Sequence, residues 1–256
     1  MNTLLGHQSF ATLPTMNTPI PPATVGEAES GLSASRRVYL CLRRRIVEMA
    51  MLPGTRVVER DIAEEFGTSR TPVHEAVQRL ADEGLIEIVP RSGTFVARIP
   101  LDALEEANLV RHALETAIIE KAAARVGPDD AARLRAILAE QEAAIGANDF
   151  GAFHRTDERF HALLAELSGY PGVWPIIQQA KTQMDRYRQL TLPLEGRMAG
   201  VLEEHRAVVD AIEARDPARA VAAMREHLDH VMPVLEITRK LRPEFFTTHL
   251  DTRPAR

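Results

Sequence analysis

The stretch Ser69-Arg70-Thr71-Pro72-Val73-His74-Glu75-Ala76-Val77-Gln78-Arg79-Leu80 decides the fold, because its pattern predicts a helix with one buried and one exposed face. Apolar residues recur at a helical spacing, at Val73, Ala76, Val77 and Leu80. Pro72 suits a first helical turn, where its missing N–H costs nothing. The spacing leaves Arg70, His74 and Arg79 outside the buried stripe. A helix with such an exposed face is suited to contact a partner outside its own domain.

Two further helices are predicted before this stretch. Apolar residues at helical spacing predict the first over about residues 35–51, with Ser33 or Ser35 available as its N-cap. A second, shorter helix is predicted over residues 60–66, and Gly67 follows where a left-handed residue would end it. The first helix carries the basic run Arg43-Arg44-Arg45, which we expect to face solvent.

Two extended runs follow the opening stretch, whose helix ends before Gly84. Residues 85–89 and 94–98 are rich in β-branched and aromatic side chains, and they flank a turn that contains Pro90 and Gly93. This composition predicts a β-hairpin. Three helices followed by a hairpin predict a winged helix-turn-helix, in which the opening stretch is the recognition helix.

After Pro100 the sequence predicts helices only. Amphipathic segments separated by short turns cover residues 101–126, 128–147, 149–169, 173–192, 196–214 and 217–240. The expected fold is therefore mainly α, an N-terminal winged helix-turn-helix followed by an antiparallel all-α bundle. The expected divisions are a flexible arm, the winged helix, the bundle and a frayed C-terminal tail, at residues 1–33, 34–99, 100–241 and 242–256.

The composition is that of a folded protein without a membrane segment. Hydrophobic residues make up 45% and charged residues 26% of the chain, and no apolar run approaches the ~20 residues that cross a bilayer. Without a secretory signal, the cytoplasm is the expected location. The net charge of −5 is uneven, because residues 34–100 carry 11 Arg against 9 acidic residues and residues 101–256 carry 20 Lys/Arg against 25. This distribution argues against indiscriminate nucleic-acid binding and is compatible with local DNA contact by the first domain. The single cysteine, Cys41, is expected to be buried.

Ionisable residues interrupt the inward stripes of three bundle segments. Asp157 and His161 are four residues apart, so they project from the same side of their helix. His205 and His227 lie in the middle of two other apolar stripes. A divalent cation would offset the cost of burying these groups, because neutral imidazole and carboxylate are its natural ligands. Each histidine alone could instead be a hydrogen-bonded core residue, but together the four residues predict a metal site. If a stripe is misplaced by one residue, the substitutes are His112, His154 and His230.

Arg111 lies on the buried face of the first bundle segment. Arginine cannot shed its charge, so a buried guanidinium needs an anion. Glu115, one turn further on, is one candidate partner. The other is a carboxylate ligand held between Arg111 and an open position on the metal. The sequence leaves both alternatives open.

Linked motifs run through residues 34–98, namely Leu52-Pro53-Gly54-Thr55, Glu59-Arg60-Asp61-Ile62-Ala63, Ser69-Arg70-Thr71-Pro72-Val73, Glu75-Ala76, Arg79-Leu80, Glu83-Gly84-Leu85-Ile86 and Gly93-Thr94-Phe95-Val96. They closely resemble the DNA-binding domain of GntR-family transcription regulators. The resemblance implies operator contacts by Arg60, Arg70, Arg79 and the wing residues Arg91, Ser92 and Gly93.

The chemistry of each side chain suggests how these contacts divide. An arginine in the major groove can read guanine, so Arg70 is assigned to base readout. Arg60 and Arg91 are assigned to phosphates, and Ser92 and Gly93 permit close backbone approach. The predicted contact set is completed by Ser69, Thr71, His74 and Arg79. Because family members often carry Arg where this chain has His74, an individual operator preference is expected there.

The bundle carries a second set of motifs, namely Arg111-His112-Ala113-Leu114-Glu115, Asp157-Glu158-Arg159-Phe160-His161, Glu204-His205-Arg206 and Arg225-Glu226-His227-Leu228. They resemble the FCD effector domain of the FadR-type subgroup of GntR regulators. The resemblance implies a divalent metal held by Asp157, His161, His205 and His227, with zinc first and nickel or manganese as alternatives. It also implies that the bundle senses a small organic acid. Six segments resemble the shorter form of this domain.

The expected protein is a homodimeric transcription regulator that binds a near-palindromic double-stranded DNA operator. A small carboxylic acid, bound at the metal and Arg111, is expected to release the operator, so the regulator would act as a repressor. One alternative is a metal-dependent enzyme acting on a small carboxylate, although no HExxH motif and no separate general base support it. The other alternative is a regulator with a purely structural metal.

Overall fold

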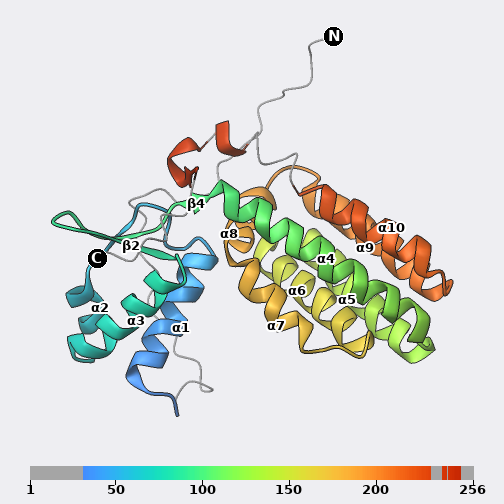
Figure 1. Ribbon diagram of the computed structural model, residues 1–256, viewed down its shortest axis with the longest axis horizontal. Coiled ribbons are helices and arrows are strands. Elements are labelled where there is room, and N and C mark those ends of the chain that lie inside the picture. Colours follow the sequence, from blue (N-terminus) through green and yellow to red (C-terminus); the bar gives the residue numbers. More distant parts are fainter. Residues whose placement is uncertain (1–30, 232–237, 241, 249–256) are drawn as a thin grey trace, which may run out of the picture. The chain divides into compact units, whose positions relative to one another are not determined.

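The computed structural model describes residues 31–231, 238–240 and 242–248 (Figure 1). They fall into two compact units, which we describe separately: residues 31–103 with 242–248, and residues 104–231 with 238–240. Both units consist mainly of helices, and the strands are few and short. The mainly helical fold predicted from the sequence is therefore confirmed. Most of the predicted arm, residues 1–30, lies outside the described residues.

The three predicted helices of the first unit are present as α1 (Ala34–Val47), α2 (Glu59–Glu65) and α3 (Arg70–Asp82). The Ser33 hydroxyl caps α1 by accepting a hydrogen bond from the Arg36 backbone N–H at 3.2 Å. Gly67 follows the end of α2 with a φ of +58°, the left-handed conformation that glycine adopts without a steric penalty. The sequence signals for the beginning of α1 and the end of α2 are thus both used.

Helix α3 buries the stripe that its sequence predicts. The side chains of Val73, Ala76, Val77 and Leu80 are each at most 1% exposed. They belong to one core cluster with apolar residues of α1 and of the following strands. Burying a valine or leucine side chain stabilises a fold by about 1.5–3 kcal/mol. This stripe therefore fixes the rotation of α3 and leaves its opposite face outside.

A three-stranded antiparallel sheet follows, with its strands in the order β1-β3-β2. The predicted hairpin is formed by β2 (Ile86–Val89) and β3 (Gly93–Val96). The pattern does not predict β1 (Arg56–Val57), which pairs with β3 through Arg56 and Phe95. Two residues are too few to show a strand's alternation. With this sheet the winged helix-turn-helix is complete.

The prediction that the basic run in α1 faces solvent is correct for Arg44, which is exposed, and wrong for Arg43 and Arg45. Arg43 Nε donates to Glu83 Oε2 at 3.0 Å. Arg45 is only 6% exposed and forms a two-point ion pair with Glu65. Arg43 and Arg45 instead tie α1 to the ends of the other two helices. Sequence reasoning misses this role because the partners lie 20 and 40 residues further along the chain.

Part of the predicted tail is folded against the first unit's connecting strand. Residues Pro243–Phe245 form a 3₁₀ turn, and β5 (Phe246–Thr247) pairs in parallel with β4 (Ile99–Pro100). Arg98 Nε donates to the Glu244 carbonyl at 3.1 Å. The chain therefore returns to its N-terminal unit after the bundle. Sequence pattern alone does not reveal this, because the pairing partners are far apart in the chain.

Replacing Phe245 with alanine should destabilise the first unit. Its side chain is fully buried, and a buried Phe→Ala change costs about 3–5 kcal/mol. The chain's one tryptophan, Trp174, lies in the bundle, so its fluorescence reports on the bundle while circular dichroism reports on both units. We expect a lower urea midpoint by circular dichroism and an unchanged Trp174 transition. Thr248→Ala, at an exposed neighbour, should change neither; an unshifted midpoint in Phe245→Ala would contradict the role of this segment.

The chain after Pro100 forms α4 (Leu101–Arg125), α5 (Pro128–Gly146), α6 (Phe150–Leu167), α7 (Val173–Ala180), α8 (Thr182–Thr191), α9 (Arg197–Glu213) and α10 (Pro217–Asp229). The fourth predicted segment is two helices that meet at Lys181. The Thr182 hydroxyl donates to the Gln178 and Gln179 carbonyls, a contact that competes with the backbone and bends helices. Helix α10 ends at Asp229, earlier than predicted, and residues 232–237 of that segment lie outside the described residues.

The bundle is held by one large apolar cluster drawn from α4, α5, α6, α7, α9 and α10. Leu134, Phe160, Ile177 and Leu228 are among its fully or almost fully buried members. Polar residues on the inward faces of these helices therefore stand out against an otherwise apolar interior.

None of the helices in the described part of the chain is both long and apolar enough to span a membrane.

Candidate metal centre and nucleic-acid interface

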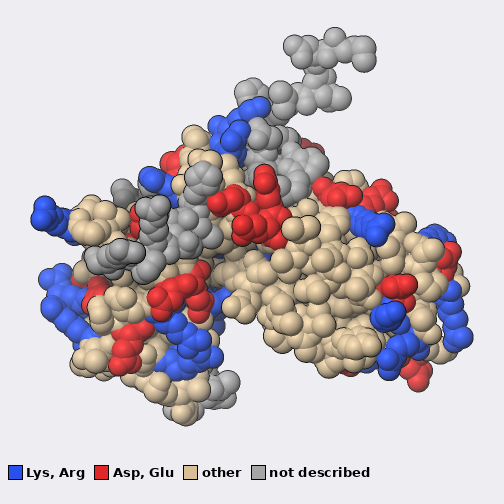
Figure 2. All heavy atoms as spheres, viewed as in Figure 1, with Lys and Arg blue, Asp and Glu red and all other residues tan. Residues whose placement is uncertain are grey.

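The exposed face of α3 carries the predicted DNA-contacting side chains. Arg70, Thr71, His74 and Arg79 are exposed, as is Ser69 immediately before the helix. Figure 2 shows basic side chains interspersed with acidic ones on the visible surface of this unit. The visible surface of this unit is therefore not uniformly basic, in agreement with the small net positive charge of residues 34–100.

Several of these side chains are held by neighbours in the same unit. His74 Nδ1 lies 3.0 Å from Glu59 Oε1, and Arg60 Nη2 lies 3.0 Å from Asp61 Oδ1. The Arg79 guanidinium stacks over the Tyr39 ring at 3.9 Å from its centroid. The two ion pairs are largely solvent-exposed, so each contributes little to stability. They orient the side chains on the surface and can be exchanged for contacts to another molecule.

The wing tip adopts an unusual backbone. Arg91 has a φ of +64° and Gly93 a φ of +137°, while the Ser92 N–H donates to the Val89 carbonyl at 3.1 Å. A Cβ on Gly93 would lie 3.4 Å from the Arg56 side chain. That distance is an ordinary contact, so it is the φ of Gly93 that favours glycine and allows the turn to present the exposed Arg91 and Ser92 at its tip.

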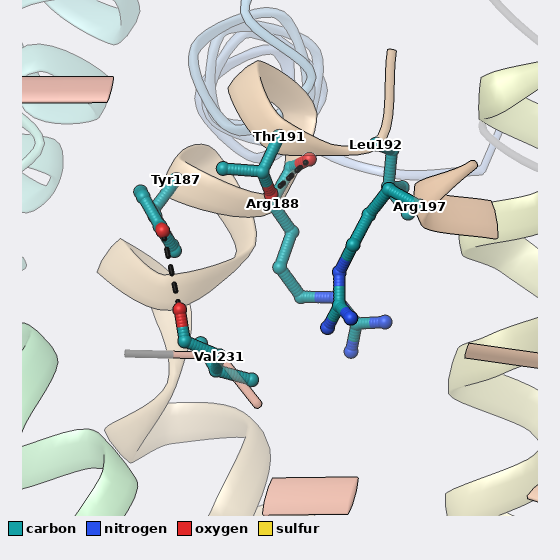
Figure 3. A pocket seen from close by; sticks show the side chains of 6 residues that line it. All are labelled: Tyr187, Arg188, Thr191, Leu192, Arg197 and Val231. Carbon is teal, nitrogen blue, oxygen red and sulfur yellow. Dashed lines mark hydrogen bonds between the residues drawn. The ribbon is translucent and has the colours of Figure 1, made fainter. Parts of the chain in front are cut away.

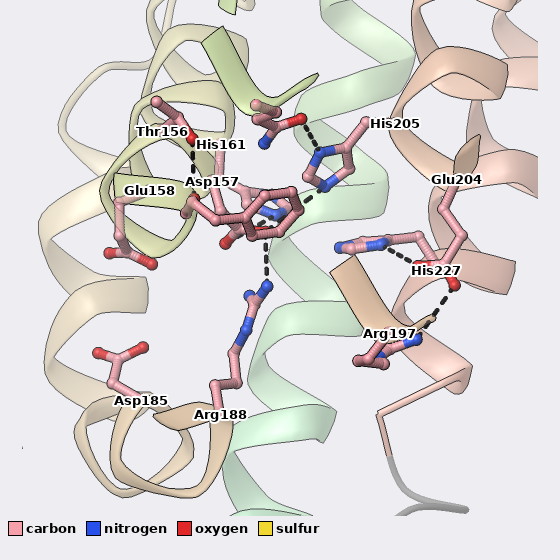
Figure 4. Close-up of polar contacts among 12 residues, drawn as sticks. Thr156, Asp157, Glu158, His161, Asp185, Arg188, Arg197, Glu204, His205 and His227 are labelled. Carbon is pink, nitrogen blue, oxygen red and sulfur yellow. Dashed lines mark hydrogen bonds and ion pairs between the residues drawn. The ribbon is translucent and has the colours of Figure 1, made fainter. Parts of the chain in front are cut away.

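In the bundle, three helices bring the four predicted metal ligands together. Asp157 and His161 come from α6, His205 from α9 and His227 from α10 (Figure 4). All four are at most 3% exposed. The three imidazoles offer nitrogens that lie within 4.8 Å of one another. The substitutes His112 and His230 lie elsewhere, in more exposed pairs with Asp229 and Glu204.

Each of the three imidazoles has an oxygen atom close to its Nδ1 on the outer side of the cluster. His205 Nδ1 is hydrogen-bonded to Gln141 Oε1 at 3.0 Å and His227 Nδ1 to Glu204 Oε2 at 2.7 Å. His161 Nδ1 lies 2.6 Å from Glu115 Oε2 without the geometry of a hydrogen bond. An acceptor at Nδ1 holds the proton there, so Nε2 carries the lone pair. This arrangement, with the outer nitrogen anchored to a carboxylate or amide, is typical of metal-binding histidines.

The inward atoms lack partners of their own. Asp157 Oδ2, His205 Nε2 and His227 Nε2 are buried and have no hydrogen-bond partner in the part of the chain that the structure describes. The Asp157 oxygens lie 3.7 Å from His205 Nε2 and 4.0 Å from His161 Nε2. When several ligand atoms each lie ~2.0–2.2 Å from one ion, the distances between the ligand atoms themselves are close to the separations seen here. The donor set and its spacing therefore fit a divalent transition metal.

The electrostatics keep these groups in the protonation state that a metal requires. Burial alone would raise the pKa of Asp157, but Arg188 and the three histidines lower it well below its usual value. Burial lowers the pKa values of His205 and His227 well below the ordinary histidine value, and neighbouring positive charges lower them further. A carboxylate and neutral imidazoles result, which are the forms that bind metal.

A second grouping, His154 with Asp157 and Glu158, is a weaker candidate. It includes Asp157, which is also a proposed ligand of the first site, and offers only one imidazole. Glu158 Oε1 already binds Lys181 Nζ at 2.6 Å. An ammonium in that position competes with a cation for the carboxylate. The three-histidine grouping is therefore the better site.

Arg111 is buried, and both alternatives for its charge find support. Its Nε donates to Glu115 Oε1 at 2.7 Å, which provides the internal partner. Its Nη2 lies 3.4 Å from His161 Nε2, at the metal cluster. Its Nη1 is buried without a hydrogen-bond partner among the described residues. Glu115 thus neutralises the positive charge of Arg111, while the Nη1 atom of the guanidinium remains available to a ligand.

Sequence reasoning misses three residues of this centre, of which one is Glu204, the partner of His227 Nδ1. Arg188 Nη2 on α8 donates to Asp157 Oδ1 at 2.5 Å, although no spacing relates the two residues. Gln141 is fully buried in the inward stripe of α5, among Leu134, Leu138 and Ala144. The rule applied to the histidines, a polar residue on an apolar stripe, would also find Gln141. No comparable sequence signal indicates the contact between Arg188 and Asp157.

Changing Gln141 to methionine should weaken the metal site without unfolding the bundle. The change keeps the volume of the side chain but removes the acceptor that holds His205 Nδ1. Loss of such an outer partner typically costs about 10- to 100-fold in metal affinity. Competition with a zinc chelator measures the effect, with Glu140→Gln, at an exposed neighbour on α5, as the control. Equal affinities in both variants would remove Gln141 from this role.

Comparison with protein families agrees with both units. Residues 34–96 match the model for bacterial regulatory proteins of the gntR family, and residues 106–230 match the FCD domain. An HTH-type transcriptional regulator in an unstable DNA locus of Streptomyces ambofaciens is 34% identical over 229 residues, which is 89% of this chain and 95% of the relative. The chain belongs to the GntR family. The FCD match places it in the FadR-type subgroup, as the motifs predict.

One further relative supports this assignment, and one solved structure supports the fold. The HTH-type transcriptional repressor RspR of Escherichia coli K12 is 30% identical over 210 residues, covering 82% of this chain and 91% of the relative. The solved structure of McbR/YncC from E. coli has a TM-score of 0.67 and 23% identity, covers 80% of this chain and 98% of that one, and supports the fold. The curated relatives are transcription regulators, so this GntR-family chain is a DNA-binding transcription regulator and not an enzyme.

Proposed function

We propose that this regulator is a homodimeric repressor that releases its operator when a small carboxylate binds beside a divalent metal, with zinc as the first candidate. The observation that carries the proposal is the buried cluster of Asp157, His161, His205 and His227. His205 and His227 are anchored at their outer nitrogens, and Asp157 Oδ2, His205 Nε2 and His227 Nε2 have no hydrogen-bond partner among the described residues. When bound, the metal supplies a positive centre with open positions for an anion.

The proposed effector contact is Arg111. Its buried, unpartnered Nη1 and the closeness of its Nη2 to His161 support a carboxylate at this point of the bundle. A ligand changes operator binding only if it binds the two arrangements of the regulator unequally. A carboxylate that draws Arg111 away from Glu115 would change the packing between α4 and α6. Nickel or manganese could occupy the same ligands, which are not specific for zinc.

The proposed DNA interface is the exposed face of α3 with the wing. Arg70 is proposed to read a base, Arg60 and Arg91 to bind phosphates, and Ser92 and Gly93 to allow close approach of the wing. The other proposed contacts are Ser69, Thr71, His74 and Arg79. One recognition helix reads only a few base pairs, so useful affinity favours a dimer on a near-palindromic site. Exposed apolar side chains in the bundle, among them Leu109 at 71% and Ile176 at 58%, support a further interface there.

One experiment tests the proposal as a whole. Operator duplexes are selected from random DNA with the full-length chain, and their affinity is measured with zinc-loaded protein in the presence of acetate, malonate and succinate. We expect one or more acids to raise the melting temperature and weaken operator binding. If chelation lowers the melting temperature but no acid changes either quantity, the metal is purely structural. A protein that retains no zinc after dialysis would overturn the metal assignment.

A further inference from the structure

A small cavity of the bundle is already occupied by internal ion pairs. Arg188 and Arg197 both line it, and it encloses about 10 Å³ (Figure 3). That volume is about the space of one water molecule. Arg188 Nη2 binds Asp157 at 2.5 Å, and Arg197 Nη1 lies 3.4 Å from Glu204 Oε1. The cavity therefore gives no basis for a further ligand site, whereas the surface of the recognition helix does.

His74 lies on the exposed face of α3, and its imidazole is held by a residue of the preceding helix. Its Nδ1 atom is hydrogen-bonded to Glu59 Oε1 at 3.0 Å. Glu59 is the first residue of α2, and its side chain is 30% exposed, against 59% for His74. Apolar residues of α2 and α3 share one buried cluster, which keeps the two helices together. The ring of His74 is therefore oriented from within its own unit.

The contact with Glu59 decides which nitrogen of His74 carries the proton. A carboxylate only accepts hydrogen bonds, so Nδ1 must be the donor. A neutral imidazole has one N–H, and its Nε2 then carries a lone pair. No hydrogen bond joins Nε2 to any other residue that the structure describes. His74 can thus accept a hydrogen bond from another molecule while it keeps its contact with Glu59.

An acceptor in the major groove selects other bases than an arginine does. Arginine donates to O6 and N7 of guanine, whereas an acceptor needs the amino group at cytosine N4 or adenine N6. Guanine and thymine present a carbonyl oxygen instead, whose lone pairs would face the lone pair of Nε2. On the strand that it contacts, His74 therefore favours cytosine or adenine over guanine and thymine.

The place of His74 on α3 limits which base pair it can reach. Arg70 and His74 are both exposed and are four residues apart, so they project from the same side of the helix. Four residues span about 6 Å along a helix axis, and stacked bases are about 3.4 Å apart. The base that His74 contacts should therefore lie within about two base pairs of the one that Arg70 contacts.

We propose that Glu59 fixes His74 as a hydrogen-bond acceptor, so that this regulator reads the amino group of a cytosine or adenine where an arginine would read guanine. The inference rests on the proposed function, because it requires the exposed face of α3 to enter the major groove. Glu59 is a positioning residue, since it acts through His74. One such hydrogen bond changes operator affinity by about 2- to 12-fold for each half-site.

The test begins with operator duplexes selected from random DNA by the full-length protein and, separately, by His74→Ala. The position at which the two selections differ is the one that His74 contacts. In the wild-type operator, the base there is then replaced by an analogue without the exocyclic amino group, purine for adenine or pyrimidin-2-one for cytosine. Titrations are made at pH 8, above the range in which histidine usually gains its charge. We expect the replacement to cost the wild type about 2- to 12-fold and His74→Ala nothing further.

Variants of Glu59 test the positioning role. Glu59→Ala should lose this dependence on the amino group, and Glu59→Gln should keep part of it, because its amide oxygen still accepts from Nδ1. His74→Arg should select guanine instead. Glu64→Ala is the matched control, because it removes the same charge from α2 at a side chain that is 75% exposed and pairs with Arg60 at 3.9 Å. The control should keep the full dependence, whereas a merely structural role of Glu59 would lower the affinity for both duplexes alike.

The failure of this inference can be told apart from the failure of the proposed interface. If the wild type ignores the amino group but loses affinity when 7-deazaguanine replaces a guanine at that position, His74 is a donor and the inference is wrong. Full dependence on the amino group in Glu59→Ala also overturns it. If Arg70→Ala weakens operator binding and His74→Ala changes neither affinity nor selected sequence, only this inference fails. If neither variant has any effect, the face of α3 is not the DNA interface.

Discussion

Replacing His205 and His227 together with alanine is expected to abolish stoichiometric zinc binding and the response of operator binding to carboxylates. The change removes two of the four proposed ligands. Four-ligand zinc sites have apparent binding free energies of about 10–16 kcal/mol, so the loss of two ligands leaves a site too weak to retain metal through dialysis. Elemental analysis measures the metal, and operator titration with malonate or succinate measures the response.

The same double variant must remain folded for this result to be informative. Both side chains are buried, so their truncation leaves space in the core. A second variant, His205→Gln with His227→Gln, fills more of that space and should also fail to hold zinc. His112→Ala changes a histidine of α4 that pairs with Asp229 outside the cluster and should retain full metal content. Stoichiometric zinc in either double variant would mean that the ligands are other residues.

Periodicity predicts those features of the fold that depend on local sequence. The stripe Val73, Ala76, Val77 and Leu80 is buried as expected, because a helix repeats its faces every few residues and the sequence shows that repeat directly. The break at Lys181 escapes prediction, because neither Gly nor Pro marks it and the Thr182 hydroxyl acts on carbonyls of the preceding turn. The pairing of β5 with β4 escapes for a different reason. It joins two short segments that are distant in the chain, and neither carries a pattern.

The centre shows the same division between local and long-range information. Asp157 and His161 could be assigned to one point because their spacing fixes it, and His205 and His227 because each is a polar residue on an apolar stripe. Their outer partners could not be paired from the sequence. Nothing in the spacing of Arg188 to Asp157, or of Gln141 to His205, indicates that they meet. Such contacts depend on how the helices are placed around one another.

Replacing Arg70 with alanine is expected to cost most of the sequence-specific operator affinity. A bidentate arginine–guanine contact contributes about 1–3 kcal/mol of discrimination, and a dimer would present two such contacts. The expected loss of about 2–6 kcal/mol corresponds to roughly 30-fold to more than 10⁴-fold in operator affinity. The variant should keep its fold and its zinc, because Arg70 is exposed on α3, outside the bundle unit. Operator affinity is measured at one fixed salt concentration against the wild type.

Arg91→Asn provides the contrast that identifies what Arg70 does. Asparagine tolerates the positive φ of residue 91, so the wing turn should be kept while a proposed phosphate-binding cation is removed. We expect Arg91→Asn to weaken operator and random DNA alike and to reduce the salt slope by about 1 for each phosphate that is no longer neutralised. Arg70→Ala should instead bring operator affinity close to that for random DNA. If Arg70→Ala weakens both duplexes equally, Arg70 binds a phosphate. Base readout must then come from elsewhere on the exposed face, with His74 the next residue to test.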